Sequence, residues 1–389
     1  MYDMNGPNVM GAGIVVSRLD ISDDSLYKVL MNLKDRGGAP LNLDSPSVFI
    51  GKQSDEIISF GSGQPDLPPP TEAVEGLNIR QDLRYGAIQG EPALREALAE
   101  EYPTSTARNF IITNGASEAL DLIFRSIGSG RVLIGQPYYY SYPHLARFGG
   151  MEPVFTQLRD GRIDLDDYES RLDGCKAVLI NSPSNPTGRI EAIETLKRIE
   201  ALTADRGIYV ISDEVYKDLI YERENYLING GHVITVNSFS KTYAMCGVRV
   251  GYLWSRDQSI VDRAIELKTH TSMNTNLVGQ DMALRAMSTP RSYIDEQLEI
   301  WRRRRSLMVA GLRSIGFRLW EPEGAFYVFP ECEEPRLLVE RLYRHYQIIA
   351  YLGEWFGAPN YIRLSYALEE REIEIGLERI GRCCREIGL

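Results

Sequence analysis

Residues that build metal centres and disulfide frameworks are scarce in this chain. Its 389 residues include only five cysteines and four histidines. Two of the cysteines, Cys383 and Cys384, are adjacent, and none of the five has the spacing of a zinc site or a disulfide framework. This cysteine usage is typical of a reducing compartment. We therefore predict a cytoplasmic protein without a metal site.

Long apolar runs and an excess of positive charge are also missing. The longest apolar runs fall well short of the ~20 residues that a membrane-spanning helix requires, and the N-terminus lacks the pattern of a signal peptide. With 43 basic and 54 acidic residues, the net charge of −11 argues against a nucleic-acid-binding protein. One basic run, Trp301 to Arg305, lies in a helical pattern with acidic neighbours, which predicts a solvated or interface helix.

The chain does contain enough apolar sequence for a large fold. Hydrophobic residues make up 43% of it, and single cores stop growing near ~250–300 residues, which predicts two domains. From about residue 92, helical patterns alternate with short apolar runs. This alternation predicts an α/β fold whose mostly parallel, seven-stranded sheet is covered by helices. The strands are expected at 109–113, 131–135, 153–156, 177–181, 208–212, 233–237 and 247–254.

The two ends of the chain have different patterns. Residues 22–36 have the periodicity of a helix, and a connector rich in Gly and Pro follows at 61–70. Towards the C-terminus, a long arginine-rich helix is expected over about 290–313, followed by a smaller α+β domain. The strands and the final helix of this domain are expected at 324–329, 361–366 and 369–387.

A lysine that follows the sixth predicted strand is the most informative residue. Lys241 lies in the segment 237–242 (NSFSKT), and Arg249 follows eight residues later. A lysine between small hydroxyl residues, with an arginine downstream, suits an amine that forms an imine with an aldehyde cofactor beside a phosphate site. A lysine in such a turn is otherwise usually a surface residue, so the interpretation depends on further motifs.

Three further motifs occur in a fixed order. They are 181–188 (NSPSNPTG) and 213–216 (DEVY), each after an apolar strand, and 361–366 (YIRLSY) near the C-terminus. With these motifs the chain resembles the class I/II aminotransferases, pyridoxal phosphate (PLP) enzymes of fold type I. It looks most like their branch of alanine, aspartate and aromatic aminotransferases. The resemblance covers roughly residues 58–389.

The resemblance implies a domain organisation in which the N-terminal segment joins the C-terminal part. Residues 1–62 would form an N-terminal arm and part of the small domain. Residues 63–286 would form the large PLP-binding domain, and residues 287–389 the C-terminal small domain.

The resemblance also implies which residues hold the cofactor. Asp213 would pair with the pyridine nitrogen, and Asn185 and Tyr216 would hydrogen-bond the 3-oxygen of the ring. Tyr139, one of four tyrosines in 136–143 (QPYYYSYP), would lie over the ring as an aromatic plate. The phosphate would be held by Ala116, Ser117, Ser238, Arg249 and Tyr85.

Several of these assignments have structural alternatives. The turn at 114–118 could be a plain helix start in which Ser117 serves only its own backbone, and Asp213 could cap a helix. Tyr85 could be a turn residue packed locally. If Tyr85 instead matches the family tyrosine that crosses to the other subunit's phosphate, the active unit is a homodimer with shared active sites.

Arg363 is the implied residue for the substrate α-carboxylate, which a guanidinium binds through two parallel hydrogen bonds. Asn185 and the backbone of Gly63 are further expected contacts of the substrate. An acidic substrate would need a second cation, for which Arg125 is a candidate. At such a position, a solvated helix arginine is the favoured alternative.

One segment departs from the family pattern. Where many relatives have a Pro-Gly turn and a short Phe-Gly, residues 350–357 read AYLGEWFG. Leu352 occupies the proline position, and Glu354 and Trp355 are bulky. These side chains could shape a pocket for large substrates, or they could only pack the small domain.

The reaction implied by the resemblance is transamination from an L-amino acid to a 2-oxo acid. It would follow a ping-pong mechanism through a Lys241 aldimine, with Asp213 and Tyr216 as further catalytic residues. Two alternatives remain: a PLP-dependent lyase or specialised amino-acid synthase of the same fold, and a regulatory or binding protein without catalysis. The intact set Asp213, Lys241, Arg249 and Arg363 argues against the latter.

Overall fold

The computed structural model describes residues 41–49, 52, 56–77, 84–222 and 225–389. The helix expected at 22–36 lies outside these residues. Residues 44–389 form one unit, to which the following description applies. The domain boundaries expected near residues 63 and 287 stay a prediction.

An eight-stranded sheet carries most of the residues singled out above. Its strand order is β2-β9-β8-β7-β6-β3-β4-β5, and only β9 and β5 run antiparallel to the rest. The predicted α/β class is confirmed, and the seven expected strands are joined by an additional two-residue edge strand, β5. The strands are β2 (Phe110–Thr113), β3 (Gly130–Gln136), β4 (Met151–Arg159), β5 (Arg162–Ile163), β6 (Cys175–Asn181), β7 (Tyr209–Asp213), β8 (Val233–Ser238) and β9 (Gly251–Ser255).

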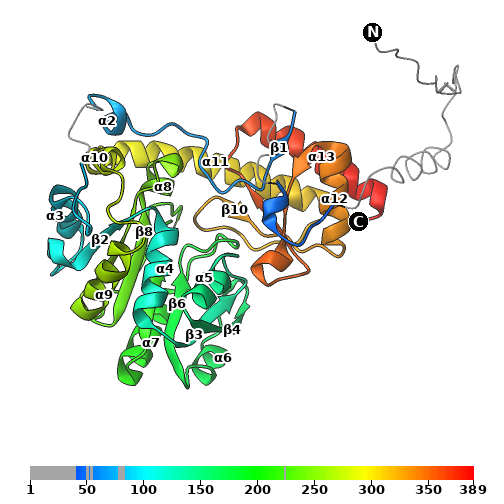
Figure 1. Cartoon of the computed structure of the whole chain (residues 1–389). Coiled ribbons are helices and arrows are strands. Elements are labelled where there is room, and N and C mark those ends of the chain that lie inside the picture. Colours follow the sequence, from blue (N-terminus) through cyan, green and yellow to red (C-terminus); the bar gives the residue numbers. More distant parts are fainter. Residues whose placement is uncertain (1–40, 50–51, 53–55, 78–83, 223–224) are drawn as a thin grey trace, which may run out of the picture. The chain divides into compact units, whose positions relative to one another are not determined.

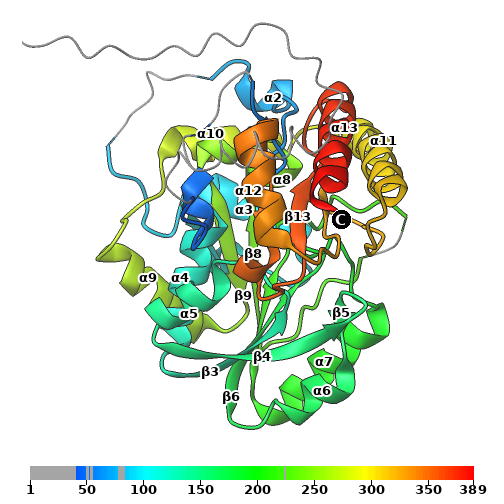
Figure 2. The same cartoon turned by 90° about the vertical axis from the view of Figure 1, so that its right-hand side faces the viewer.

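Helices cover both faces of this sheet, as Figure 2 shows. Leu120 of α4, Ala146 of α5 and Ile260 of α9 belong to the buried cluster on one face, while Tyr168 of α6 and Leu196 of α7 belong to the cluster on the other. The central strands are therefore buried on both sides, which explains their continuous apolar runs. The helices are α3 (Pro92–Glu101), α4 (Ala116–Ile127), α5 (Tyr142–Phe148), α6 (Leu165–Ser170), α7 (Ile193–Arg206), α8 (Phe239–Thr242), α9 (Gln258–Thr269) and α10 (Leu277–Ala286).

The C-terminal segments form two small sheets with helices beside them. Strand β13 lies between β10 and β12, and β1 pairs with β11, so residues 58–59 join the C-terminal part of the chain. Figure 1 shows α11 running from α10, beside the large sheet, to these small strands. The strands are β1 (Ile58–Ser59), β10 (Tyr327–Val328), β11 (Ile348–Ile349), β12 (Tyr351–Leu352) and β13 (Ile362–Ser365). The helices are α2 (Thr71–Val74), α11 (Arg291–Ile315), α12 (Pro335–Tyr346) and α13 (Glu370–Ile387), with 3-10 turns η2 (Pro46–Phe49), η3 (Ala107–Asn109), η4 (Cys246–Val248) and η5 (Gly353–Phe356).

The sequence predicted a solvated or interface helix for the basic run in α11, and two of its arginines are buried. Arg304 and Arg305 are only 5% and 8% exposed. Arg304 pairs with Asp66 at 2.6 Å, and Arg305 pairs with Glu222 at 2.6 Å. The solvated alternative is therefore excluded for these two residues, while the interface alternative stays a prediction. Their carboxylate partners lie far away in the sequence, and each partner compensates a charge that is otherwise costly to bury.

The strand order brings the predicted motifs to one edge of the large sheet. Because β9 runs antiparallel to β8, Arg249, two residues before β9, lies at the same edge as Lys241, three residues after β8. Strand β2, on the other side of β9, ends at this edge too and leads into the turn at 114–117. Asn181 and Asp213 are neighbours in register at the ends of β6 and β7. This edge is where open α/β sheets bind ligands.

Candidate active site

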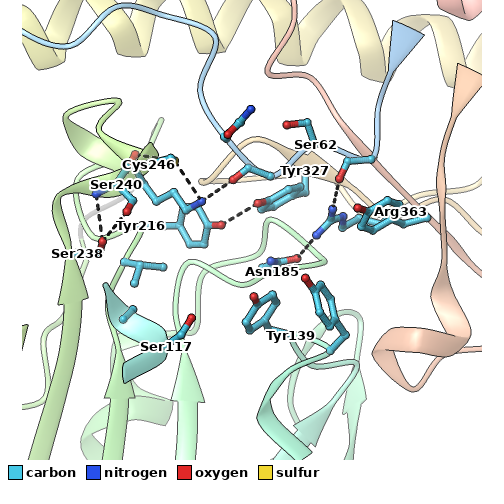
Figure 3. A pocket seen from close by; sticks show the side chains of 18 of the residues that line it. Ser62, Ser117, Tyr139, Asn185, Tyr216, Ser238, Ser240, Cys246, Tyr327 and Arg363 are labelled. Carbon is cyan, nitrogen blue, oxygen red and sulfur yellow. Dashed lines mark hydrogen bonds between the residues drawn. The ribbon is translucent and has the colours of Figure 1, made fainter. Parts of the chain in front are cut away.

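A cavity of about 570 Å³ lies at this edge, between the ends of the large sheet and the small sheets. Figure 3 shows Arg363 and Asn185 towards one end of it and Ser117 and Ser238 towards the other. All the predicted site residues except Tyr85 line this cavity. They are Gly63, Ala116, Ser117, Tyr139, Asn185, Asp213, Tyr216, Ser238, Lys241, Arg249 and Arg363.

Lys241 is held in the cavity by a short helix. Its position on α8 is set by Ser238, whose side chain caps the helix by accepting a hydrogen bond from Ser240 N at 3.1 Å. Lys241 Nζ donates to the carbonyl oxygen of Gly63 and lies 3.9 Å from Cys246 Sγ. The structure therefore uses Ser238 to position the lysine and presents the amine to the cavity.

Asp213 is a buried carboxylate at the wall of the cavity. It is 4% exposed, and its two oxygens accept hydrogen bonds from Tyr142 Oη at 2.7 Å and Val215 N at 3.3 Å. Burial raises its pKa to about 6, although these hydrogen bonds and the positive charge of Lys241 act in the opposite direction. A buried carboxylate in such a setting favours a cationic group as its neighbour.

The turn before α4 lies at one end of the cavity and has features that suit an anion. Gly115, the N-cap of this 12-residue helix, has φ +77°, and a Cβ there would lie 2.5 Å from Arg249 Nη2. Arg249 itself adopts a left-handed conformation, with φ +60°, that is uncommon for a residue with a side chain. Its guanidinium donates to Cys246 O at 3.0 Å. The helix N-terminus, the Ser117 hydroxyl and this guanidinium together suit a phosphate.

Arg363 is buried at the opposite end, with an exposed fraction of 2%. It donates to Asn185 Oδ1 at 3.0 Å and to Gly61 O at 2.7 Å, and its Nε has no hydrogen-bond partner among the described residues. Three aromatic rings, those of Tyr327, Tyr351 and Phe356, lie 4.5 to 4.9 Å from the guanidinium. These contacts orient the guanidinium and leave it donor capacity for an anionic ligand.

Two tyrosines of the site were not singled out from the sequence. Tyr142 donates to Asp213, and Tyr327 lies 2.8 Å from Tyr216, hydroxyl to hydroxyl. Tyr142 belongs to the motif of four tyrosines, where we had expected only Tyr139 to touch the ligand. Tyr327 follows Gly324-Ala-Phe, a strand candidate that carried no signal for the site.

The remaining sequence candidates lie outside the lining. Tyr85 is 82% exposed, and Arg125 pairs with Asp121 on the surface of α4. Glu354 pairs with Arg336 of α12. Trp355 packs edge-on against Phe49 and Tyr351, which both line the cavity, so it supports the aromatic wall from behind.

Neither a metal site nor a membrane-spanning helix is found among the described residues. No group of three or more His, Cys, Asp or Glu side chains that could hold a metal ion occurs among them. None of the helices formed by these residues is long and apolar enough to span a membrane.

Comparisons with known proteins place the chain among proteins of one family. The profile of the family described as aminotransferase class I and II matches residues 55–380. A probable aspartate/prephenate aminotransferase of Aquifex aeolicus is 33% identical over 366 residues, covering 85% of this chain and 92% of the relative. An aspartate aminotransferase of Thermotoga maritima is 31% identical over 360 residues, covering 87% and 94%.

Solved structures agree as well. A double mutant of Thermus thermophilus aspartate aminotransferase has a TM-score of 0.82 and 28% identity, covering 90% of this chain and 98% of that chain. An aromatic aminotransferase from Pyrococcus horikoshii OT3 has a TM-score of 0.80 and 30% identity, covering 86% and 97%.

Proposed function

Because this chain belongs to the class I and II aminotransferases and is therefore an aminotransferase, we propose that it is PLP-dependent, with Lys241 as the amine that carries the cofactor. It would move an amino group from an L-amino acid to a 2-oxo acid by a ping-pong mechanism. The observation that carries this proposal is the convergence of Lys241, Asp213, the turn at 114–117 and Arg363 on one cavity. The family is generally dependent on PLP, which agrees with this set.

The residues of the cavity fit the cofactor at both ends of its ring. Asp213 is a buried carboxylate that a protonated ring nitrogen would compensate. The turn at 114–117, with Gly115 leaving room for Arg249, offers donors of the kind a phosphate requires. Tyr139 would lie against the ring, and Asn185 and Tyr216 would hydrogen-bond its 3-oxygen. When bound, the cofactor supplies an electron sink for the negative charge that develops at the substrate α-carbon.

The chain's own residues would provide positioning and proton transfer. Arg363, held by Asn185 and three aromatic rings, binds the substrate α-carboxylate and fixes the orientation of the α-carbon. Lys241 Nζ would accept the proton that leaves the substrate α-carbon. The resulting ammonium would return a proton to the cofactor's imine carbon, so that the lysine ends neutral again. Asp213 keeps the ring nitrogen protonated throughout.

A product assay tests this proposal against the alternative of a lyase. Cofactor-loaded protein, incubated with single L-amino acids, should release one 2-oxo acid per active site. It should retain the amino group until a second 2-oxo acid is added. Release of free ammonia instead would assign the chain to the lyases, and the absence of any 2-oxo acid across the panel would reject the enzyme altogether.

Replacing Arg363 with alanine should weaken the apparent affinity for amino and 2-oxo acids by about 10- to 150-fold. The reason is the loss of a charge-assisted hydrogen-bonded pair, worth ~1.5–3 kcal/mol. Amines that lack a carboxylate should be little affected, because nothing in them contacts the guanidinium. Steady-state kinetics with both substrate types checks this. Equal weakening for both would mean that the substitution damages the site as a whole.

We propose further that the protein is a homodimer in which Tyr85 reaches the phosphate of the partner. Tyr85 supports this proposal because 82% of its surface is exposed and it lies outside the cavity of its own subunit.

We also propose a domain division from the resemblance to the family. Residues 63–286 would form a large domain, and residues 1–62 and 287–389 would form a small one. The pairing of β1 with β11 supports this division.

Mixing two damaged variants tests the shared site. Tyr85→Ala and Lys241→Ala should each be impaired, but subunit exchange should create heterodimers in which one site has both residues intact. Partial activity should therefore return on mixing, measured against each variant alone. The shared site would be contradicted if subunits exchange but no activity returns. It would also be contradicted if the protein sediments as a monomer and is fully active.

A further inference from the structure

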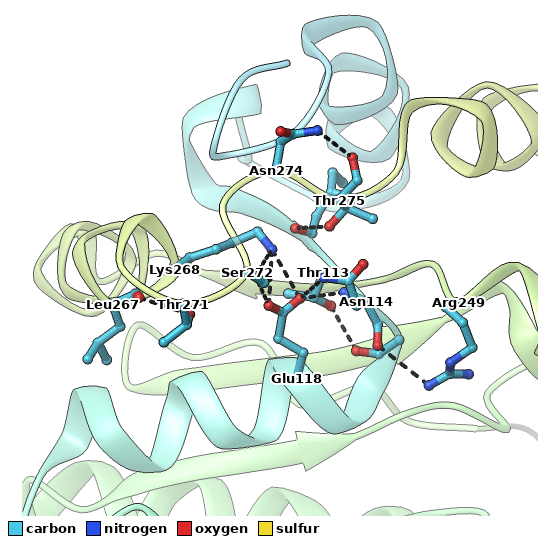
Figure 4. A network of polar contacts seen from close by, with 12 residues as sticks. Thr113, Asn114, Glu118, Arg249, Leu267, Lys268, Thr271, Ser272, Asn274 and Thr275 are labelled. Carbon is cyan, nitrogen blue, oxygen red and sulfur yellow. Dashed lines mark hydrogen bonds and ion pairs between the residues drawn. The ribbon is translucent and has the colours of Figure 1, made fainter. Parts of the chain in front are cut away.

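A fully buried lysine lies behind the phosphate-binding turn. Lys268, in the last turn of α9, has a side chain that is 0% exposed. Its Nζ lies 3.0 and 3.1 Å from the two carboxylate oxygens of Glu118 and donates to Ser272 Oγ at 2.8 Å. Figure 4 shows that Lys268 reaches Glu118 from a separate helix, across the start of α4.

Glu118 connects this lysine to the turn. Its carboxylate accepts from the backbone N of Asn114 at 2.5 Å and from the side-chain amide of Asn114 at 3.0 Å. The carbonyl oxygen of Asn114, in turn, lies 3.5 Å from Arg249 Nη2. The contacts therefore run from Lys268 through Glu118 and Asn114 to Arg249, and so reach a residue that lines the cavity (Figure 4).

The loop after α9 is anchored to the same region. Ser272 donates to Glu118 Oε1, and Thr275 donates to Ile112 O, in the strand that leads into the turn, at 3.1 Å. Lys268 is therefore surrounded by segments that are fixed to each other, which explains how its charge is kept away from solvent. The helix geometry alone would not require a lysine here, since Glu118 could contact the Asn114 amide without one.

The charges explain what the lysine adds. Glu118 lies in the first turn of α4, one residue from Ser117, so an unneutralised carboxylate there would oppose the binding of an anion at the same helix terminus. Lys268 supplies the compensating positive charge at bonding distance. Glu118 is partly buried, with 15% of its side chain exposed. A carboxylate in this position that loses its partner is destabilised and moves or recruits water, and the turn attached to it would move as well.

We propose that Lys268 and Glu118 are positioning residues for the cofactor: their ion pair cancels the carboxylate charge and fixes Asn114, and through it the turn and Arg249, for phosphate binding. Neither residue touches the ligand. This role rests on the proposed use of PLP. The ion pair would support the phosphate end of the cavity, and it would have no effect on the end around Arg363, which binds the carboxylate.

The experiment measures ligand binding to cofactor-free protein by absorbance titration and calorimetry. Three ligands are compared: PLP, inorganic phosphate, and pyridoxal, which lacks the phosphate. Lys268→Met should weaken PLP and phosphate on the order of tenfold or more, as loss of a supporting residue typically does. Pyridoxal should bind as it does to the wild type. The double variant Lys268→Met/Glu118→Gln should regain much of the phosphate affinity, because the uncompensated carboxylate is gone.

Controls separate this role from a general defect. Lys217→Met removes another lysine that pairs with a carboxylate, Glu101, away from the turn, and should leave phosphate affinity unchanged. If Lys268→Met does not fold, Lys268→Gln, which can still hydrogen-bond Glu118 but carries no charge, takes its place with the same expectation.

The outcomes distinguish the two proposals. The positioning role is overturned if Lys268→Met binds phosphate as tightly as the wild type does. It is also overturned if the variant loses as much affinity for pyridoxal as for PLP. Either result leaves the proposed function intact. A wild-type protein that binds neither PLP nor phosphate overturns both.

Discussion

Replacing Lys241 with alanine should lower the rate of amino-group transfer on the order of 10⁴-fold, the largest loss expected for any single residue. A positioned general acid or base contributes up to about 10⁴-fold to the rate of a reaction. No other lysine lines the cavity among the described residues, so no neighbouring amine can take over the proton. Single-turnover kinetics with an active amino acid should reveal the loss in the chemical step and not in substrate affinity.

Two variants and a labelling experiment control this result. Lys241→Arg keeps a positive charge at the position but cannot supply a neutral amine, so it should be as inactive as Lys241→Ala. Lys197→Ala removes an exposed lysine from α7 and should retain full activity. Borohydride reduction of the cofactor-loaded protein, followed by peptide mapping, should place the pyridoxyl group on Lys241. A label on a different lysine contradicts the assignment.

Asp213→Asn should have the second largest effect, a loss of about 10²–10⁴ in turnover with some PLP still bound. The amide keeps the shape of the side chain but cannot hold a proton on the ring nitrogen. Asp213→Glu, which retains the charge but shifts it by one methylene, should be less impaired. An Asp213→Asn enzyme with nearly wild-type turnover would refute the role.

The raised pKa of Asp213 adds a pH dependence that can be measured without the cofactor. Burial raises its pKa from 3.8 to about 6, so the folded state favours the protonated acid. The stabilising contribution of that acid is fully present below pH about 4 and is lost as the pH rises through about 6. In cofactor-free protein, Asp213→Asn should therefore gain stability over the wild type as the pH rises from 5 to 8. Denaturant unfolding at both pH values checks this, and a difference that does not change with pH contradicts it.

The sequence was a good guide to the site wherever a motif followed a strand. The carboxyl ends of parallel strands meet at one edge, so the motifs at 114–117, 181–188, 213–216 and 237–242 had to converge once the strands were recognised. Arg363 was predicted only from the order of the family motifs. It lies on a separate small sheet, and no local sequence pattern links that sheet to the large one.

The parts that the sequence did not reveal depend on contacts between distant residues. The buried Arg304 and Arg305 have Asp66 and Glu222 as ion-pair partners, and spacing along the chain does not predict such pairs. The strand expected at 247–254 begins only at Gly251. Residues 246–248 form a 3-10 turn, and Arg249 adopts a left-handed conformation that an apolar pattern does not indicate.

Gly251 has a consequence for how enzymes of this kind can diverge. A Cβ at this position would lie 2.7 to 2.9 Å from backbone atoms of Asn237, Gly115 and Ala116, so three chain segments meet here through main-chain atoms alone. Substituting side chains cannot change a distance that is set by main-chain contacts. We therefore expect the distance between α8, which carries Lys241, and the turn at 114–117 to vary little among related sequences. At the opposite end the cavity is walled by side chains, among them the ring of Phe49. If the proposed roles hold, we expect substrate preference to diverge at that end, where side chains set the shape, more readily than at the end where main-chain atoms set it.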